Sequence, residues 1–263
     1  MNKIHNETQK KDVLRFALFI GELMMSNGAE TSRVEDTIMR ICKSRGFNHI
    51  NVFTSPTALI ISDERFDGLT FMKTIKNRSI DLNKIVLFND LSRKFVNSPE
   101  LSIEEAIEEL KEINNNSFSY PSCINYIAIG LACASFAFLI GGNTEINFIL
   151  TTIVSILGFI SYKQIIKLSS IPSFASLVAS TIIGIGGIAF TQIGLLESPT
   201  TLIVGSIMPL LSGVSFVKGV RDLISGELIS GVARIFDACL TAISIATGVG
   251  LILEFWIAVG GVL

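Results

Sequence analysis

The sequence predicts an α-helical integral membrane protein with about five transmembrane helices, preceded by a small cytoplasmic α+β domain. Of the 263 residues, 49% are hydrophobic and 17% are charged, and the mean hydropathy is +0.57. Soluble domains carry about 25% charged residues. The charges are also unevenly placed, since only 11 of the 21 basic and 23 acidic residues follow residue 121. Long uncharged stretches fill that second part, and a spanning helix needs about 20 mainly apolar residues.

Composition also excludes several classes of function. A net charge of −2 argues against a basic nucleic-acid binder, so we expect no nucleic-acid partner. The two histidines, His5 and His49, are far apart in the chain, which disfavours histidine-based metal catalysis. The cysteines are scattered without a CxxC pair. We therefore expect no metal and no cofactor.

The chain begins with a polar tail, residues 1–11, that has no apolar core and is not expected to be a signal peptide. Apolar residues at helical spacing predict a core helix over 12–26, ended by Asn27-Gly28. Ser32 and Glu35 fit a capping box, which predicts that a second helix starts here and is stabilised by their reciprocal hydrogen bonds.

The rest of a 12–113 α+β domain follows from residue type and capping signals. β-branched residues predict strands over 49–54 and 57–62, with a third over 68–75 after a turn at Asp63–Asp67. Helices are predicted over about 81–97 and 102–113, the second with a capping box at Ser102 and Glu105. Residues 114–121 are polar and are predicted to be a linker.

Residues 122–263 are predicted to form the transmembrane domain. The expected spans are about 122–141, 145–162, 171–194, 199–217 and 236–258. With a cytoplasmic N-terminal domain, the second and fourth connections lie inside, and they carry all five cations of this half of the chain. This positive-inside pattern predicts a multi-pass protein of the cell membrane with its C-terminus outside.

The fourth expected span contains a predicted helix break. Pro209 lies in an apolar run with Gly205 and Gly213 four residues to either side. Proline removes a helical hydrogen bond, and glycine weakens the same turns. Freed backbone groups at membrane depth are tolerated only where they face protein or a water-lined cavity, which is how discontinuous helices build transporter sites.

Ionisable and hydroxyl side chains follow this break. They are Arg221, Asp222, Glu227, Arg234, Asp237, Thr241 and Ser244. Arg234 and Asp237 are three residues apart and can pair on one helix. Asp237, Thr241 and Ser244 form a polar stripe leading into the fifth span, which is typical of a solute pathway. The alternative is a cytoplasmic loop whose charges only balance one another.

A second candidate motif lies where the first two helices meet. It consists of Gly28, Glu30, Thr31, Arg33 and Glu35. Gly28 can adopt a positive φ, and Thr31 or Ser32 can cap the following helix, so the helix N-terminus could hold an anion. The alternative is a plain helix–turn–helix junction with solvated charges. No nucleophile elbow, P-loop or HExxH site is present, so we do not expect an enzyme.

These two blocks resemble the threonine/serine exporter family. The resemblance rests on Gly21-Glu22-Leu23, on Ser26 through Glu35, on Thr57-Ala58-Leu59-Ile60, and on Pro209-Leu210-Leu211 through Arg221-Asp222, Gly226, Gly231 and Arg234. It covers roughly residues 12–250. The chain departs from the family's Pro-Leu-x-Pro-Gly pattern at Ser212, which predicts a milder break in the fourth span.

The resemblance implies a subunit of an inner-membrane exporter of small polar metabolites, either threonine and serine or C4-dicarboxylates such as succinate. It also implies a second, small multi-span membrane subunit as partner, with a homo-oligomer as the other arrangement. Without a nucleotide-binding motif, an ion gradient is the expected energy source. The alternatives are a membrane-tethered metabolite sensor or assembly protein and a membrane-anchored hydrolase.

Overall fold

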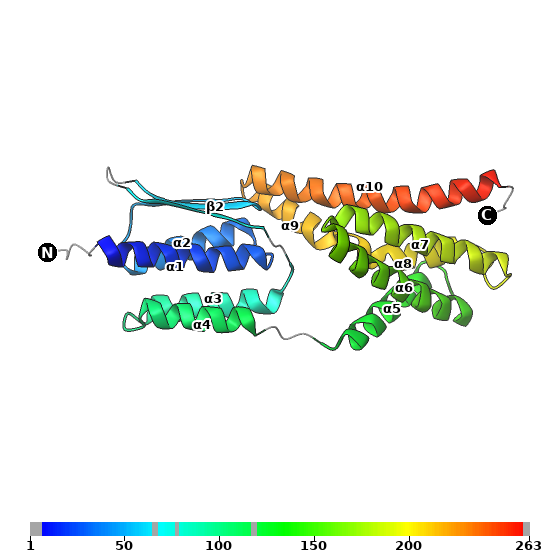
Figure 1. Cartoon of the computed structure of the whole chain (residues 1–263), viewed down its shortest axis with the longest axis horizontal. Coiled ribbons are helices and arrows are strands. Elements are labelled where there is room, and N and C mark those ends of the chain that lie inside the picture. The colour runs from blue at the N-terminus through cyan, green and yellow to red at the C-terminus, as the bar shows by residue number, and fades with distance from the viewer. Residues whose placement is uncertain (1–6, 65–67, 77–78, 117–119, 260–263) are drawn as a thin grey trace. The chain divides into compact units, whose positions relative to one another are not determined.

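A computed structural model describes residues 7–64, 68–76, 79–116 and 120–259 of the chain, which form mostly helices and one small sheet (Figure 1). Most of the 1–11 tail, the centre of the Asp63–Asp67 turn and part of the 114–121 linker lie outside the described residues. The chain forms two compact units. Unit 1 is Met1–Phe118 with Val217–Arg234, and unit 2 is Ser119–Phe216 with Ile235–Leu263.

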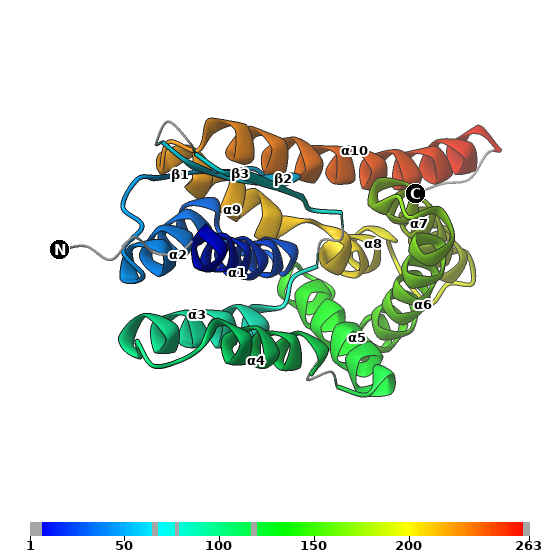
Figure 2. The same ribbon diagram turned by 60° about the vertical axis from the view of Figure 1, so that its left-hand side comes forward.

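Unit 1 is built in layers around the helices α1 (Glu7–Ser26) and α2 (Thr31–Ser44). On one side lies an antiparallel sheet of order β1-β2-β3 (Ile50–Thr54, Ala58–Asp63, Thr70–Thr74), and on the other lie α3 (Leu82–Asn97) and α4 (Ile103–Asn115) (Figure 2). These elements confirm the predicted order of strands and helices, but α1 begins at Glu7, so residues 7–11 are helical and the predicted tail is too long. The core between the layers includes the fully buried Phe16, Phe88, Phe95, Ile38 and Leu59.

The two predicted capping boxes have different outcomes. At α4, Ser102 Oγ accepts from the Glu105 N–H and Glu105 reaches back to the Ser102 N–H, as predicted. At α2 the prediction is wrong, because the helix begins at Thr31 and its N-cap, Glu30, makes no side-chain cap. Glu35 accepts a hydrogen bond from the Thr54 N–H at 2.9 Å instead. The Thr54 N–H at the end of β1 thus binds the Glu35 carboxylate in place of the Ser32 N–H that the capping box would have used.

Unit 2 contains α5 (Ser122–Leu139), α6 (Glu145–Ser169), α7 (Pro172–Gln192), α8 (Thr200–Ile207) and most of α10 (Leu228–Ala258). Helices α5, α6, α7 and α10 are long and apolar enough to cross a membrane. A bent helix pair, Thr200–Leu210 with Gly213–Ile224, supplies the fifth candidate span. The described residues thus confirm a mainly helical chain with four to five spans.

The expected break in the fourth span is present and is more complex than a kink. Helix α8 runs into the short 3₁₀ helix η1 (Met208–Leu210), which contains Pro209, and α9 (Gly213–Ile224) starts after Leu211 and Ser212 with a bend of 56°. Gly205 was expected to belong to the break, but it lies inside α8. A Cβ there would lie 2.7 Å from Ala137 Cβ and 2.9 Å from Cys133 O, so Gly205 allows α5 to approach closely.

Gly248 allows α10 to pack closely on α7, and its substitution tests this packing. A Cβ at Gly248 would lie 2.2 Å from Ser180 Oγ and 2.5 Å from Leu177 O, whereas a Cβ at Gly250 would meet nothing within 4 Å. Gly248→Ala is expected to destabilise unit 2 by about 1–3 kcal/mol, because one element must shift. Gly250→Ala is the matched control and should be neutral or stabilising by up to about 1 kcal/mol.

Both variants are checked by thermal unfolding of the purified full-length protein in detergent micelles. Equal melting temperatures for the two variants would contradict the packing described for α7 and α10.

Candidate functional site

The α1–α2 junction is a tight turn whose backbone is internally satisfied. Gly28 has φ +87°, and its N–H donates to Met25 O at 3.0 Å, while the Ala29 N–H donates to Met24 O at 2.9 Å. Because a positive φ strains residues with a side chain, glycine suits this position. The turn leaves the carbonyls of Gly28 and Ala29, together with the first turn of α2, available to other elements.

Those groups are contacted by the Val217–Arg234 segment, which lies between the two parts of unit 2 in the sequence but belongs to unit 1. This α9–α10 hairpin is the segment formed by the end of α9, a turn at Gly226 and the start of α10. Gly226 has φ +90°, and the Glu227 N–H after it donates to Asp222 O at 2.9 Å. A Cβ at Gly231 would lie 2.6 Å from Leu223 Cγ, so the two arms of the hairpin pack closely.

A buried ion pair lies at the centre of this contact. Asp222 is 1% exposed, and its Oδ2 lies 2.9 Å from Arg234 Nε, although the Nε–H is not aligned with it for a hydrogen bond. The Thr31 hydroxyl donates to the same oxygen at 3.3 Å, and Arg234 Nη2 donates to Ala29 O at 3.0 Å. Asp222 therefore places a negative charge beside the positive end of α2.

Weaker contacts surround the pair. Arg221 Nη1 lies 2.9 Å from Glu30 Oε1, but the Arg221 side chain is 65% exposed. Lys218 Nζ donates to Gly28 O, and the Ser230 hydroxyl donates to Thr54 O at 3.4 Å. The hairpin is thus attached to both the α1–α2 junction and the end of β1.

The N-terminal motif and the charged residues of the α9–α10 hairpin therefore contact each other. One ion pair differs from the prediction. Arg234 pairs with Asp222 across the hairpin and not with Asp237 on its own helix. Asp237, Thr241 and Ser244 lie further along α10, in unit 2. There the Thr241 hydroxyl donates to Asp237 O at 3.0 Å and the Ser244 hydroxyl to Leu240 O at 2.8 Å.

The anion expected at the N-terminus of α2 is supplied by the chain itself. The carboxylate that contacts Thr31 is that of Asp222. Its other oxygen, Oδ1, is buried and has no hydrogen-bond partner within the part of the chain that the structure describes. Lys218 was not predicted as a site residue, although its position one helical turn before Asp222 is visible in the sequence.

Glu35 and Glu227 form a second acidic element of unit 1. Burial first, and then the negative charge of Glu227, raise the pKa of Glu35 from 4.5 to about 7, although the hydrogen bond from the Thr54 N–H acts in the opposite direction. A carboxyl group in this environment changes protonation near neutral pH. Among the described residues, no cluster of three or more histidine, cysteine or acidic side chains could hold a metal ion.

Unit 2 contains a polar seam that the sequence analysis did not identify. Asn147, Thr151 and Ser155 are buried on one face of α6, and Asn147 Nδ2 donates to Thr201 Oγ1 at 2.7 Å. Ser155 Oγ donates to Ser206 Oγ at 3.0 Å. Such hydrogen bonds join helices in an apolar medium, so this seam holds α6 against the helix that precedes the break.

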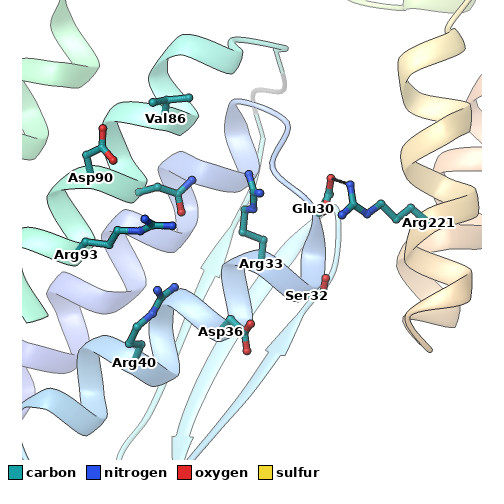
Figure 3. A pocket seen from close by; sticks show the side chains of 10 residues that line it. Glu30, Ser32, Arg33, Asp36, Arg40, Val86, Asp90, Arg93 and Arg221 are labelled. Atoms are coloured by element: carbon teal, nitrogen blue, oxygen red, sulfur yellow. Dashed lines mark hydrogen bonds and ion pairs between the residues drawn. The ribbon is translucent and has the colours of Figure 1, made fainter.

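Unit 1 also contains an arginine-rich groove of about 450 Å³ (Figure 3). It is lined by residues of α2, α3 and α9, among them Glu30, Arg33 and Arg221. Arg33 and Glu30 come from the N-terminal motif and Arg221 from the hairpin, so the groove adjoins the junction.

Together, the apolar spans, the broken helix and the N-terminal α+β unit define a multi-span membrane protein of the transporter type. The chain belongs to the ThrE family of threonine/serine exporters, whose family model matches residues 15–256. The match includes both sequence motifs. No solved structure matches the chain.

Relatives of two lengths are similar to the chain. A Mycobacterium tuberculosis protein named "Probable threonine/serine exporter" is 23% identical over 93% of this chain and 46% of that protein. The Corynebacterium glutamicum "Threonine/serine exporter" is 22% identical over 94% of this chain and 52% of that protein. The chain thus spans about half the length of these two. The Escherichia coli K12 "Probable succinate transporter subunit YjjP" is 21% identical over 94% of this chain and 96% of that protein.

The buried ion pair predicts a large loss of stability on neutralisation. Asp222→Asn leaves the Arg234 guanidinium buried without its counter-charge, and should destabilise unit 1 by about 3–5 kcal/mol. The control Arg221→Gln removes an exposed pair and should cost less than about 1 kcal/mol. Thermal unfolding of the full-length protein measures both, and a smaller effect for Asp222→Asn than for Arg221→Gln would refute the assignment.

The raised pKa of Glu35 predicts a pH dependence of stability. Because the folded state binds the proton more tightly than the unfolded state, this group's contribution falls as the pH rises from 4.5 to about 7. In Glu35→Gln this loss of stability with rising pH should be absent. The variant should therefore be more stable, relative to wild type, above pH 7 than at pH 4.5. The measurement is the melting temperature between pH 4.5 and 8, with Asp90→Asn, an exposed carboxylate that is not among the charges acting on Glu35, retaining the wild-type dependence.

Proposed function

We propose that the chain is a subunit of an inner-membrane exporter that moves small polar metabolites and is driven by an ion gradient. The observation that carries the proposal is the broken helix α8–η1–α9 in a multi-span chain of an exporter family. The substrates are threonine and serine, or C4-dicarboxylates such as succinate, because relatives of these two kinds are named after them.

Unit 1 is formed by two separate segments of the chain, and this supports an orientation of the protein in the membrane. Met1–Phe118 and Val217–Arg234 form one compact unit, so we place both on the same side of the membrane. An even number of crossings must then separate them. Helices α5, α6 and α7 supply three, and the bent pair supplies the fourth. A re-entrant loop at that place would leave three crossings and put the two parts of unit 1 on opposite sides.

The distribution of cations supports placing unit 1 in the cytoplasm. On this path the cytoplasmic residues between spans include Lys163, Lys167 and the cations of the α9–α10 hairpin, while the external connections carry only Glu145 and Glu197. This agrees with the positive-inside rule. Helix α10 is then the fifth crossing and takes the C-terminus outside.

The solute path lies near the break and the polar face of α10. The break interrupts the regular helix between α8 and α9, and Asp237, Thr241 and Ser244 supply polar side chains. Asp237 is exposed in the described structure and is the residue proposed to change protonation during transport. Asp222 and Arg234 act by positioning the α9–α10 hairpin, while Arg221 and Glu227 are proposed to contact the solute.

We propose a second, small multi-span membrane subunit as the partner. The support is the word "subunit" in the name of the full-length relative, together with the half-length match to the exporters. A second copy of this chain is the other arrangement to be tested.

Flux through proteoliposomes tests the function. The chain is reconstituted alone and together with a candidate partner, and labelled threonine, serine and succinate are followed under an imposed pH gradient. Saturable, gradient-dependent flux is expected, and Asp237→Asn should lower it at least about tenfold if proton transfer limits transport. Thr247→Ala on the same helix is the control. Folded protein that moves no solute in either arrangement would favour the sensor alternative.

A further inference from the structure

The arginine-rich groove of unit 1 has an unusual arrangement of charge. Three of its arginines, Arg33 and Arg40 on α2 and Arg93 on α3, extend into the space between the two helices (Figure 3). Arg33 and Arg40 are seven residues apart, two turns of helix, which separates their backbones by about 10 Å. Arg93 reaches in from the opposite helix. The groove therefore has arginine on both walls, with four arginines and three acidic residues in its lining.

The three guanidinium groups are exposed and are not held in ion pairs. Across the ranges that the structure describes, Arg33 and Arg93 form no ion pair, and Arg40 has only a 3.5 Å contact from Nη2 to Thr37 Oγ1. Three acidic residues, Glu30, Asp36 and Asp90, also line the groove, and Figure 3 shows the Asp90 carboxylate turned away from the Arg93 guanidinium. At the far end, Arg221 is already paired with Glu30.

The lining has one more arginine than acidic residues, and arginine does not lose its proton in proteins, so the groove keeps positive groups that can attract an anion. Guanidinium groups bind carboxylate and phosphate with two parallel hydrogen bonds, which gives both affinity and geometric selectivity. The volume of about 450 Å³ falls within the range of small-molecule sites.

We propose that this groove binds a small molecule with at least two negative charges, carried by carboxylate or phosphate groups. Two separated arginines on α2 and a third on α3 suit such a ligand better than a monovalent anion. The site goes beyond the transport function, since its lining residues all belong to unit 1. The ligand comes from one of two sources: a free polyanionic metabolite or the headgroup of an anionic lipid.

Binding to the full-length protein tests the proposal without any need for transport. Citrate and pyrophosphate are titrated calorimetrically into protein in neutral detergent, with sodium chloride at equal ionic strength as the reference. The double variant Arg33→Gln/Arg93→Gln should bind about 100-fold more weakly, about tenfold for each guanidinium group that is removed. Arg15→Gln is the matched control, because Arg15 is 65% exposed on α1 and outside the groove.

A second arm separates the two sources. The melting temperatures of wild type and double variant are compared in micelles containing phosphatidylglycerol or phosphatidylcholine. Arginine-dependent binding of citrate or pyrophosphate assigns the site to a free anion. A response to phosphatidylglycerol alone, absent in the double variant, assigns it to a lipid headgroup. No response to either, or equal responses in wild type and double variant, would overturn the proposal.

Discussion

The carboxylate of Asp222 is the group on which the organisation of unit 1 depends. It is removed from solvent and lies between Arg234, on the other arm of the α9–α10 hairpin, and Thr31, at the start of α2. Burying two charges carries a desolvation cost that their attraction only partly offsets, so such pairs contribute more to a specific arrangement than to net stability. Here the pair fixes which segment packs on the α1–α2 junction, although 191 residues separate Thr31 from Asp222.

One chain segment therefore serves two units. Helix α9 begins at Gly213, directly after the break, and its tenth residue is Asp222. Helix α10 starts with Leu228, passes Arg234 and continues as an apolar helix to Ala258. The ion pair thus joins the two helices that flank the α9–α10 turn, one of which starts at the break proposed for the solute path. Any movement of the break must be accommodated along α9, either by bending the helix or by straining this pair.

Features set by local sequence were predictable, whereas those set by distant partners were not. Uncharged stretches located the spans, and Ser102 and Glu105 located the start of α4, because both signals act over a few residues. Glu35 was misassigned because the Thr54 N–H, distant in sequence, competes for it. Arg234 likewise has two acids within reach, and only the fold selects Asp222. The four-residue spacing of Asn147, Thr151 and Ser155 was visible in the sequence and could have predicted the α6 seam.

The most direct test is the side of the membrane on which the α9–α10 turn lies. Single cysteines replace the exposed residues Ser225 in that turn, Glu104 in α4 and Asn143 between α5 and α6, after Cys123 and Cys239 are changed to serine. Cys42 can stay, because burial raises the pKa of its thiol to about 12 and keeps it unreactive. An impermeant maleimide added to intact cells should label position 143 but label positions 225 and 104 only after permeabilisation. Labelling of 225 from outside while 104 stays protected would contradict the account.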